Sequence, residues 1–367
     1  MKRGCVIGYD INEKGCQISY YDDSMEEPDT MMASSNNYLI PLVLGYFKDR
    51  WVFGKEAKRL AVVGEDCTET DLYGKAKRRE KVSLAGKTYD AVWLLAKYIS
   101  LTLQDFENIQ YLTFTTPETD VDMAKMLKGI GQHIGVDKEI INVQDYKESF
   151  CQYMIFQPKE LWQYESALFY CDEDRIKAYM LRRLRVDASH GMNSFVTVDE
   201  VANAQRKELE ALYPIMNKEK SPDESFKSMI ENVFEKKVIS SVYLTGEGFE
   251  KNWYPNSLRV LCNGRRAFMG NNLYSKGACY KSIRKCEPND DGPIYLDETK
   301  LTERICLRMR VDGQEGWYPL VTWGTHWYEA DGQWEVLLED ASDIEILVES
   351  LVDEEVQVEK VSLEGLP

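Results

Sequence analysis

Residues 5–21 read CVIGYDINEKGCQISYY, and this stretch decides the fold. The apolar run CVIGY at 5–9 leads into the mostly polar segment 10–15, DINEKG. The segment 16–21, CQISYY, then alternates apolar and polar side chains. A polar segment with a glycine between two such runs is typical of a turn, so the stretch predicts a β-hairpin.

Strands and helices alternate from this hairpin to about residue 165. The segment 90–106 carries apolar residues at helical spacing, and the strand 111–115 stops at Thr116-Pro117. Such an order predicts an α/β lobe over residues 1–165. Its other predicted elements are strands at 38–47, 51–53 and 140–143, and a helix that Thr119 or Asp120 can cap and that runs to about Gly135.

Residues 166–286 are predicted to form a second α/β lobe. Two capping boxes, at 197–200 (TVDE) and 221–224 (SPDE), each predict the start of a helix. Strands are predicted at 167–170, 176–184, 242–244 and 258–262, with an acidic turn at 172–174. A last helix is predicted at 273–283.

The C-terminal part has a different character. Residues 287–293 have the composition of a linker, and 294–367 is predicted to be an acidic β-rich domain. Its five predicted strands suggest a small sandwich: 304–311, 317–323, 333–338, 344–351 and 356–363. Of the chain's net charge of -17, residues 287–367 supply -16, from 21 acidic and 5 basic residues.

Composition excludes several classes of function. The acidic balance and the shortness of the basic runs 75–79 and 182–185 argue against nucleic acid as a partner. The nine cysteines are scattered without a C-x-x-C, which predicts reduced, mostly buried thiols, and the three histidines lack metal-ligand spacing. The sequence has no long apolar run, so we expect no membrane partner. We expect a soluble cytoplasmic protein.

The hairpin also carries a motif. Residues 6–12, VIGYDIN, resemble the first phosphate-binding hairpin of the actin-like ATPase superfamily, apolar-Gly-apolar-Asp-apolar-Gly-Thr. Residues 242–249, VYLTGEGF, resemble the nucleoside-binding turn of the seventy-kilodalton heat-shock chaperones in that superfamily. Further segments resemble those chaperones in the same order and bring the coverage to roughly residues 4–285: 40–57, 113–117, Glu148 and 277–279.

The resemblance implies a two-lobed, actin-like (ribonuclease H-like) α/β fold with an added C-terminal all-β domain. It implies ATP with Mg²⁺ as the cofactor, and Asp10 as the candidate metal ligand or catalytic base. We therefore expect Asp10, Gly246 and Gly248 to line one cleft, unless the glycines simply end a strand. The implied nucleotide-contacting residues are Asp10, Asn12, Gly246, Glu247 and Gly248.

The chain departs from the family at both phosphate-binding turns. Backbone N–H groups reach phosphate where side chains are absent, which is why the family has glycines there. Here Asn12 and Glu13 replace a glycine and a threonine, and residues 170–175, YCDEDR, replace the second glycine-rich turn. Each carboxylate that lies about 4 Å from a phosphate charge costs about 1 kcal/mol in water, and more in a dry cleft.

Three hypotheses follow from these departures. The first is a chaperone-like pseudo-ATPase scaffold that binds protein partners, with weak or absent nucleotide binding and no enzymatic activity. The others are an active ATPase or sugar-type kinase, and a filament-forming structural protein. A basic or extended peptide is the partner expected for 294–367, unless its four tryptophans form the core of a sandwich: Trp317, Trp323, Trp327 and Trp334.

Overall fold

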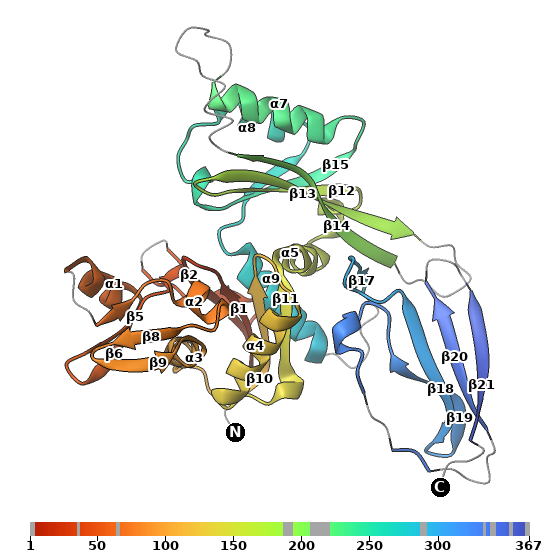
Figure 1. The fold of residues 1–367 in the computed structure, drawn as a ribbon. Coiled ribbons are helices and arrows are strands. Elements are labelled where there is room, and N and C mark those ends of the chain that lie inside the picture. The colour runs from red at the N-terminus through yellow and green to blue at the C-terminus, as the bar shows by residue number, and fades with distance from the viewer. Residues whose placement is uncertain are drawn as a thin grey trace. The chain divides into compact units, whose positions relative to one another are not determined.

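Two compact units make up the protein, Met1–Met180 with Asp199–Asp290, and Leu181–Val198 with Asp291–Pro367. None of the helices in the described part of the chain is long and apolar enough to cross a membrane. A computed structural model describes residues 4–34, 37–63, 67–185, 194–205, 221–286, 292–332, 335–337, 343–351 and 355–363 (Figure 1).

The first sheet of the first unit is built on the hairpin predicted from residues 5–21. β1 (Cys5–Ile11) pairs antiparallel with β2 (Gly15–Tyr21). On its other side β1 pairs in parallel with β10 (Ile109–Thr116), and β10 in parallel with β11 (Ile141–Asp145). Two short strands extend the sheet beyond β2: β3 (Asp29–Thr30) and β4 (Ile40–Pro41).

The second sheet repeats this arrangement. β12 (Glu165–Cys171) and β13 (Arg175–Arg185) form its hairpin, and β12 pairs in parallel with β15 (Ile239–Thr245). β15 pairs in parallel with β16 (Arg266–Met269). With β14 (Ser194–Gln205), the order β16-β15-β12-β13-β14 corresponds strand for strand to β11-β10-β1-β2-β3. The first unit therefore contains one strand plan twice.

Two helices at the first sheet require close backbone approach. α5 (Tyr146–Ile155) and α9 (Leu273–Cys286) pack together, and α9 also lies along β1 and β10 (Figure 1). A Cβ atom on Gly8 would clash with the backbone of α9, and one on Gly277 would clash with the backbone of Ser149 in α5. Glycine at these two positions is thus a packing requirement.

Several helices begin at side-chain caps or prolines. Asp90, Asp120 and Asp145 accept backbone N–H groups at the starts of α3 (Ala91–Thr102), α4 (Val121–His133) and α5. The other elements are α1 (Gly54–Val63), α2 (Leu72–Lys77), α7 (Pro222–Phe234), α8 (Pro255–Leu261), β5 (Leu44–Phe47), β6 (Arg50–Phe53), β7 (Thr68–Glu69), β8 (Lys81–Leu84) and β9 (Lys87–Asp90).

Two predictions for the second lobe were wrong. The segment 197–200 starts no helix, because it lies in β14, where the buried Val196 and Val198 give a strand alternation that outweighs the capping signal. The segment 258–262 is no strand, because it belongs largely to α8. The buried carboxylate of Asp223 accepts the N–H groups of Asn256 and Ser257 (both 2.8 Å) and caps this helix from a distant point in the sequence.

The second unit is an antiparallel sheet with a small core. β18 pairs with both β19 and β20, and β20 pairs with β21. Phe195, Leu296 and Leu351 are buried, with Ile294 and Trp323 packed on them. β17 (Ile294–Tyr295) pairs in parallel with the start of β14 inside this unit. The sheet strands are β18 (Glu303–Val311), β19 (Gln314–Val321), β20 (Asp343–Ser350) and β21 (Val356–Ser362).

The C-terminal prediction needs correction on one point. Four of the five predicted strands are present, but the described residues of the segment 333–338, which are 335–337, form no strand. In the part of the chain that the structure describes, a single four-stranded sheet therefore replaces the predicted sandwich. Most of the predicted linker 287–293 lies outside the described residues.

The cysteine prediction is confirmed. All nine cysteines are free thiols, and six of them are buried: Cys16, Cys67, Cys151, Cys171, Cys279 and Cys306.

Candidate functional site

Asp10 is a buried carboxylate at the end of β1. Its side chain is only 4% exposed, and Oδ1 accepts a hydrogen bond from the Tyr146 hydroxyl at 2.8 Å. Burial raises the pKa of Asp10 to about 7, although the hydrogen bond from Tyr146 acts in the opposite direction. A carboxyl group with this pKa exists in both protonation states near neutral pH.

Asn12 closes the turn between β1 and β2. Its Oδ1 accepts the backbone N–H groups of Lys14 (2.9 Å) and Gly15 (3.3 Å), while its own N–H donates to the Gly15 carbonyl (3.0 Å). Its side-chain amide also donates to the Tyr146 hydroxyl at 3.0 Å. The turn's backbone donors at 14 and 15 are therefore already bonded within the turn.

Asp172 closes the turn between β12 and β13 in the same way as Asn12 closes the first turn. Its Oδ1 accepts the N–H groups of Asp174 (2.7 Å) and Arg175 (2.8 Å), and its own N–H donates to the Arg175 carbonyl (3.1 Å). The turns 12–15 and 172–175 thus share one hydrogen-bond pattern. The preference of Asn and Asp for such turns could have indicated this pattern from the sequence.

Two tyrosines stack beside Asp10. The rings of Tyr146, at the start of α5, and Tyr274, at the start of α9, lie 3.7 Å apart with planes 7° from parallel. The Tyr274 hydroxyl is buried and has no hydrogen-bond partner among the described residues. Burial, followed by the neighbouring Tyr179, Tyr170 and Asp10, raises the pKa of Tyr274 well above its usual value. The pair could not be predicted from the sequence, since no local pattern joins residues so far apart.

Gly246 and Gly248 follow β15 and pack against the second hairpin. Gly246 has φ +96°, and a Cβ atom there would clash with the carbonyl group of Cys171. A Cβ atom on Gly248 would clash with the Cys171 sulfur atom. The two glycines therefore allow the turn after β15 to lie directly against the end of β12.

Glu247, between these glycines, forms an ion pair with Lys14 of the first turn. Burial by itself would lower the pKa of Lys14, but the hydrogen bond to Glu247 and the charges of Glu247, Glu173 and Asp172 raise it above its usual value. The first turn, the second turn and the glycine turn consequently lie within electrostatic reach of one another. In this respect the structure brings the predicted residues 10, 12 and 246–248 into one region.

This region offers few groups for a cofactor. No group of three or more His, Cys, Asp or Glu side chains in the described part of the chain is arranged to hold a metal ion. The amides that could bind phosphate at 14, 15, 174 and 175 are bonded to side chains of their own turns. A phosphate could bind these amides only after displacing the side-chain oxygens of Asn12 and Asp172.

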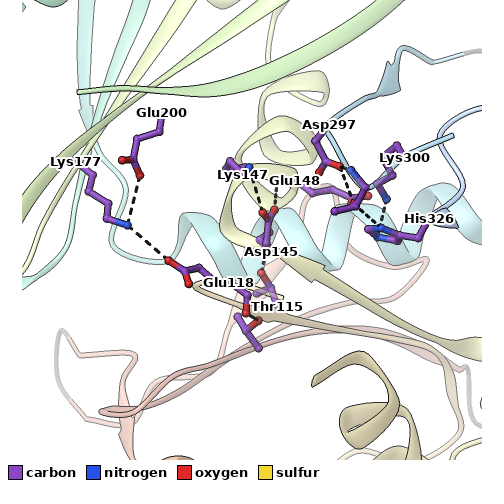
Figure 2. A network of polar contacts seen from close by, with 12 residues as sticks. Thr115, Glu118, Asp145, Lys147, Glu148, Lys177, Glu200, Asp297, Lys300 and His326 are labelled. Atoms are coloured by element: carbon purple, nitrogen blue, oxygen red, sulfur yellow. Dashed lines mark hydrogen bonds and ion pairs between the residues drawn. The ribbon is translucent and has the colours of Figure 1, made fainter. Parts of the chain in front are cut away.

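Polar contacts also surround Asp145, the cap of α5. Its carbonyl accepts the Thr115 hydroxyl at 3.3 Å, and Lys147 Nζ lies 4.0 Å from its carboxylate (Figure 2). Lys177 on β13 lies 3.4 Å from Glu200 on β14 and 3.9 Å from Glu118 after β10. Glu148 of α5 is buried and receives a hydrogen bond from Lys281 of α9 at 2.8 Å. The Lys177–Glu118 and Lys281–Glu148 pairs each join a segment before residue 165 to one after it.

A separate chain of hydrogen bonds lies in the second unit. Lys300 Nζ is 2.8 Å from His326 Nε2, and the ring's Nδ1 is 2.9 Å from the Thr299 hydroxyl (Figure 2). Because an ammonium group only donates, Nε2 accepts and Nδ1–H donates to Thr299, whose O–H donates to Asp297 (2.7 Å). Lys300 and His326 are both buried, so this chain satisfies polar groups inside the unit.

The tryptophans of the C-terminal part lie in two environments. Trp323 packs in the small core, under the Arg304 guanidinium at 4.3 Å from its ring centre. Trp317 and Trp327 are 38% and 57% exposed. Trp334 lies outside the described residues. The alternative that these tryptophans form a core thus holds for one of the three that are described.

The molecule is an α/β protein with two mixed sheets and a separate C-terminal antiparallel sheet. Residues 27–298 match the model of a family of unknown function, DUF5716, C-terminal part, and the chain belongs to this family. Residues 300–367, which hold the antiparallel sheet, match a domain of unknown function, DUF8552. A search of the curated proteins finds no match.

Proposed function

We propose that this protein is a chaperone-like scaffold with an actin-like, nucleotide-free pseudo-ATPase body, and that it binds protein partners. One observation carries the proposal. In both hairpin turns a side-chain oxygen, from Asn12 in one and Asp172 in the other, accepts two backbone N–H groups that could otherwise bind phosphate. A phosphate group would have to displace these oxygens before it could bind.

The repeated strand plan supports the actin-like part of the proposal. Each sheet starts from a hairpin and continues through two parallel strands, as expected for two lobes that each present one hairpin turn. The ion pair between Lys14 and Glu247 neutralises the cation of the first turn, so that Lys14 is not free to bind phosphate. The acids at 172–174 add negative charge to the same region.

Asp10 is the one observation that favours the rival, an active ATPase or sugar-type kinase. A pKa of about 7 suits a general base at neutral pH. However, a base must reach the proton that it removes, and Asp10 is almost fully buried with Tyr146 on its Oδ1. The geometry of the two hairpin turns does not favour the third hypothesis, a filament-forming protein.

Calorimetric titration of the full chain with ATP and Mg²⁺ tests the proposal. We expect no saturable binding up to about 1 mM ATP, which corresponds to a binding free energy weaker than about 4 kcal/mol. A parallel assay of phosphate release should show no turnover. A micromolar dissociation constant together with hydrolysis that disappears in Asp10→Asn would refute the proposal in favour of the rival.

Two variants of one residue test the stated cause. Asp172→Asn keeps an acceptor oxygen in the turn, whereas Asp172→Gly frees the N–H groups of residues 174 and 175. If side-chain caps prevent phosphate binding, only the glycine variant can gain measurable affinity for ATP. Equal gains in both variants would show that charge, not the occupied amides, is the obstacle.

A further inference from the structure

A groove lies between α3 and α4 in the first unit, away from the hairpin turns. Its volume is about 380 Å³, within the usual range of ligand sites, and its lining is mainly apolar. α3 and α4 pack against one another (Figure 1). The apolar lining consists of Val92, Trp93 and Ala96 from α3 and Met126, Gly129 and Ile130 from α4.

Gly129 lines this groove without a side chain. It lies in the middle of α4, where glycine costs about 1 kcal/mol relative to alanine. A Cβ atom at this position would meet nothing within 4 Å, so packing does not require glycine here. The absent side chain leaves the groove open at this position. Trp93 also lines the groove and is 38% exposed, so that a bound apolar side chain could contact its ring.

The edge of the groove is basic. Arg79, Lys125 and His133 line it, all three are exposed, and none has an ion pair or hydrogen bond through its side chain within the described residues. The single acid of the lining, Asp90, already accepts the N–H groups of Val92 and Trp93 as the cap of α3. The groove therefore combines apolar surface with unpaired positive charge.

Arg79 occupies a backbone position that favours glycine. Its φ is +54°, and the bonds Arg79 N–H to Ala76 O and Glu80 N–H to Lys75 O end α2 in a Schellman motif. Glycine is the usual residue at this point because other residues are strained there. An arginine at this position is thus unfavourable for the local backbone and places a cation at the groove.

We propose that the groove binds the acidic segment 331–343, DGQWEVLLEDASD, of a second copy of this chain. The segment has five acidic residues and no basic one, which complements Arg79 and Lys125. Among its described residues, Leu337 is 98% exposed and Val336 is 45% exposed. Exposed aliphatic side chains flanked by acids match an apolar groove with basic edges. Glu335 precedes them, and Glu339 and Asp340 follow in the sequence.

Such a contact joins different surfaces of two copies. It would link chains head to tail, so that copies form a closed ring or an open filament. Self-association should therefore depend on protein concentration. It should also weaken with salt, because charged groups at the edge of the groove would contribute to it.

A fluorescently labelled synthetic peptide of residues 331–343 is the probe, titrated into the full chain. We expect saturable binding that is at least about fivefold weaker for Arg79→Gly, which removes one charge contact. Gly129→Leu, which fills the groove, should abolish binding. Arg79→Gly relieves the positive φ, so its thermal unfolding should be unchanged or slightly higher, which separates loss of binding from loss of fold. A peptide with Leu337→Ser should not bind.

Sedimentation of the full chain distinguishes a second copy from another partner. We expect the weight-average mass to rise with concentration for the natural chain and to stay at that of a monomer for Leu337→Ser and Gly129→Leu. The proposal is overturned if the peptide fails to bind, or if Arg79→Gly and Gly129→Leu bind it as well as the natural chain. It is also overturned if the peptide binds but the chain is monomeric at all concentrations, since the groove then serves a different acidic ligand.

Discussion

At the scale of single residues, side chains of the hairpin turns and of α5 satisfy nearby polar groups. Asn12 and Asp172 satisfy the donors of their turns, and Tyr146 satisfies Asp10. The positions of Asp10 and of the glycines at 246 and 248 could be predicted, because their motifs are local. The stack of Tyr146 on Tyr274 could not, because it depends on how α5 and α9 meet.

Asp10 should make stability depend on pH. Its pKa is about 7 in the folded protein against an ordinary 3.8, so the folded state holds the proton more tightly than the unfolded chain. The stability from this group is complete below about pH 4 and is lost as pH rises to about 7, by up to about 4 kcal/mol. In Asp10→Asn this loss should be absent. The measurement is urea unfolding of both proteins at pH 4.5, 6 and 8, and a difference between them that does not change with pH would contradict the assignment.

At the scale of elements, sequence motifs predict a helix correctly where the residues of the motif themselves cap it. Ser221 and Pro222 predicted the start of α7, and the structure has the Ser221 hydroxyl on the N–H of Glu224 at 3.2 Å. The start of α8 escaped prediction because its cap, Asp223, comes from the beginning of α7. The strand β14 was not predicted, because burial of its valines outweighs the helix signal of the capping box.

Substitution by alanine should change the stability of the protein in opposite directions at two helical glycines. Gly277 faces the backbone of Ser149, so Gly277→Ala must push α9 away from α5 and should cost about 1–3 kcal/mol. Gly129 faces open space, so Gly129→Ala should stabilise the protein by about 0.5–1 kcal/mol through helix propensity. Thermal or urea unfolding of the pair measures both effects. Equal changes in the two variants would mean that propensity, and not the contact of α9 with α5, governs position 277.

At the scale of the whole molecule, the net negative charge is concentrated in the C-terminal part. Residues 287–367 carry -16 of the net charge of -17, and Trp317 and Trp327 are exposed there. The charge asymmetry and the order of α/β and β-rich parts could be predicted from composition and periodicity. The number of sheets in the tail could not, because the same alternation of side chains suits one sheet or two.

The tail should carry the protein's contacts with basic or extended partners. The test compares affinity pull-downs of the full chain and of a chain lacking residues 300–367. This boundary keeps β17 paired with β14, whereas a cut at 294 would remove that strand. We expect the partners to be lost on truncation, and also in the double variant Trp317→Ala, Trp327→Ala. In the double variant the fold should persist, because both rings are substantially exposed.

Trp323→Ala is the matched comparison: it removes a ring of the small core and should lower the stability of the second unit by about 3 kcal/mol or more. A set of partners that is unchanged by truncation would place the binding surface in the first unit instead.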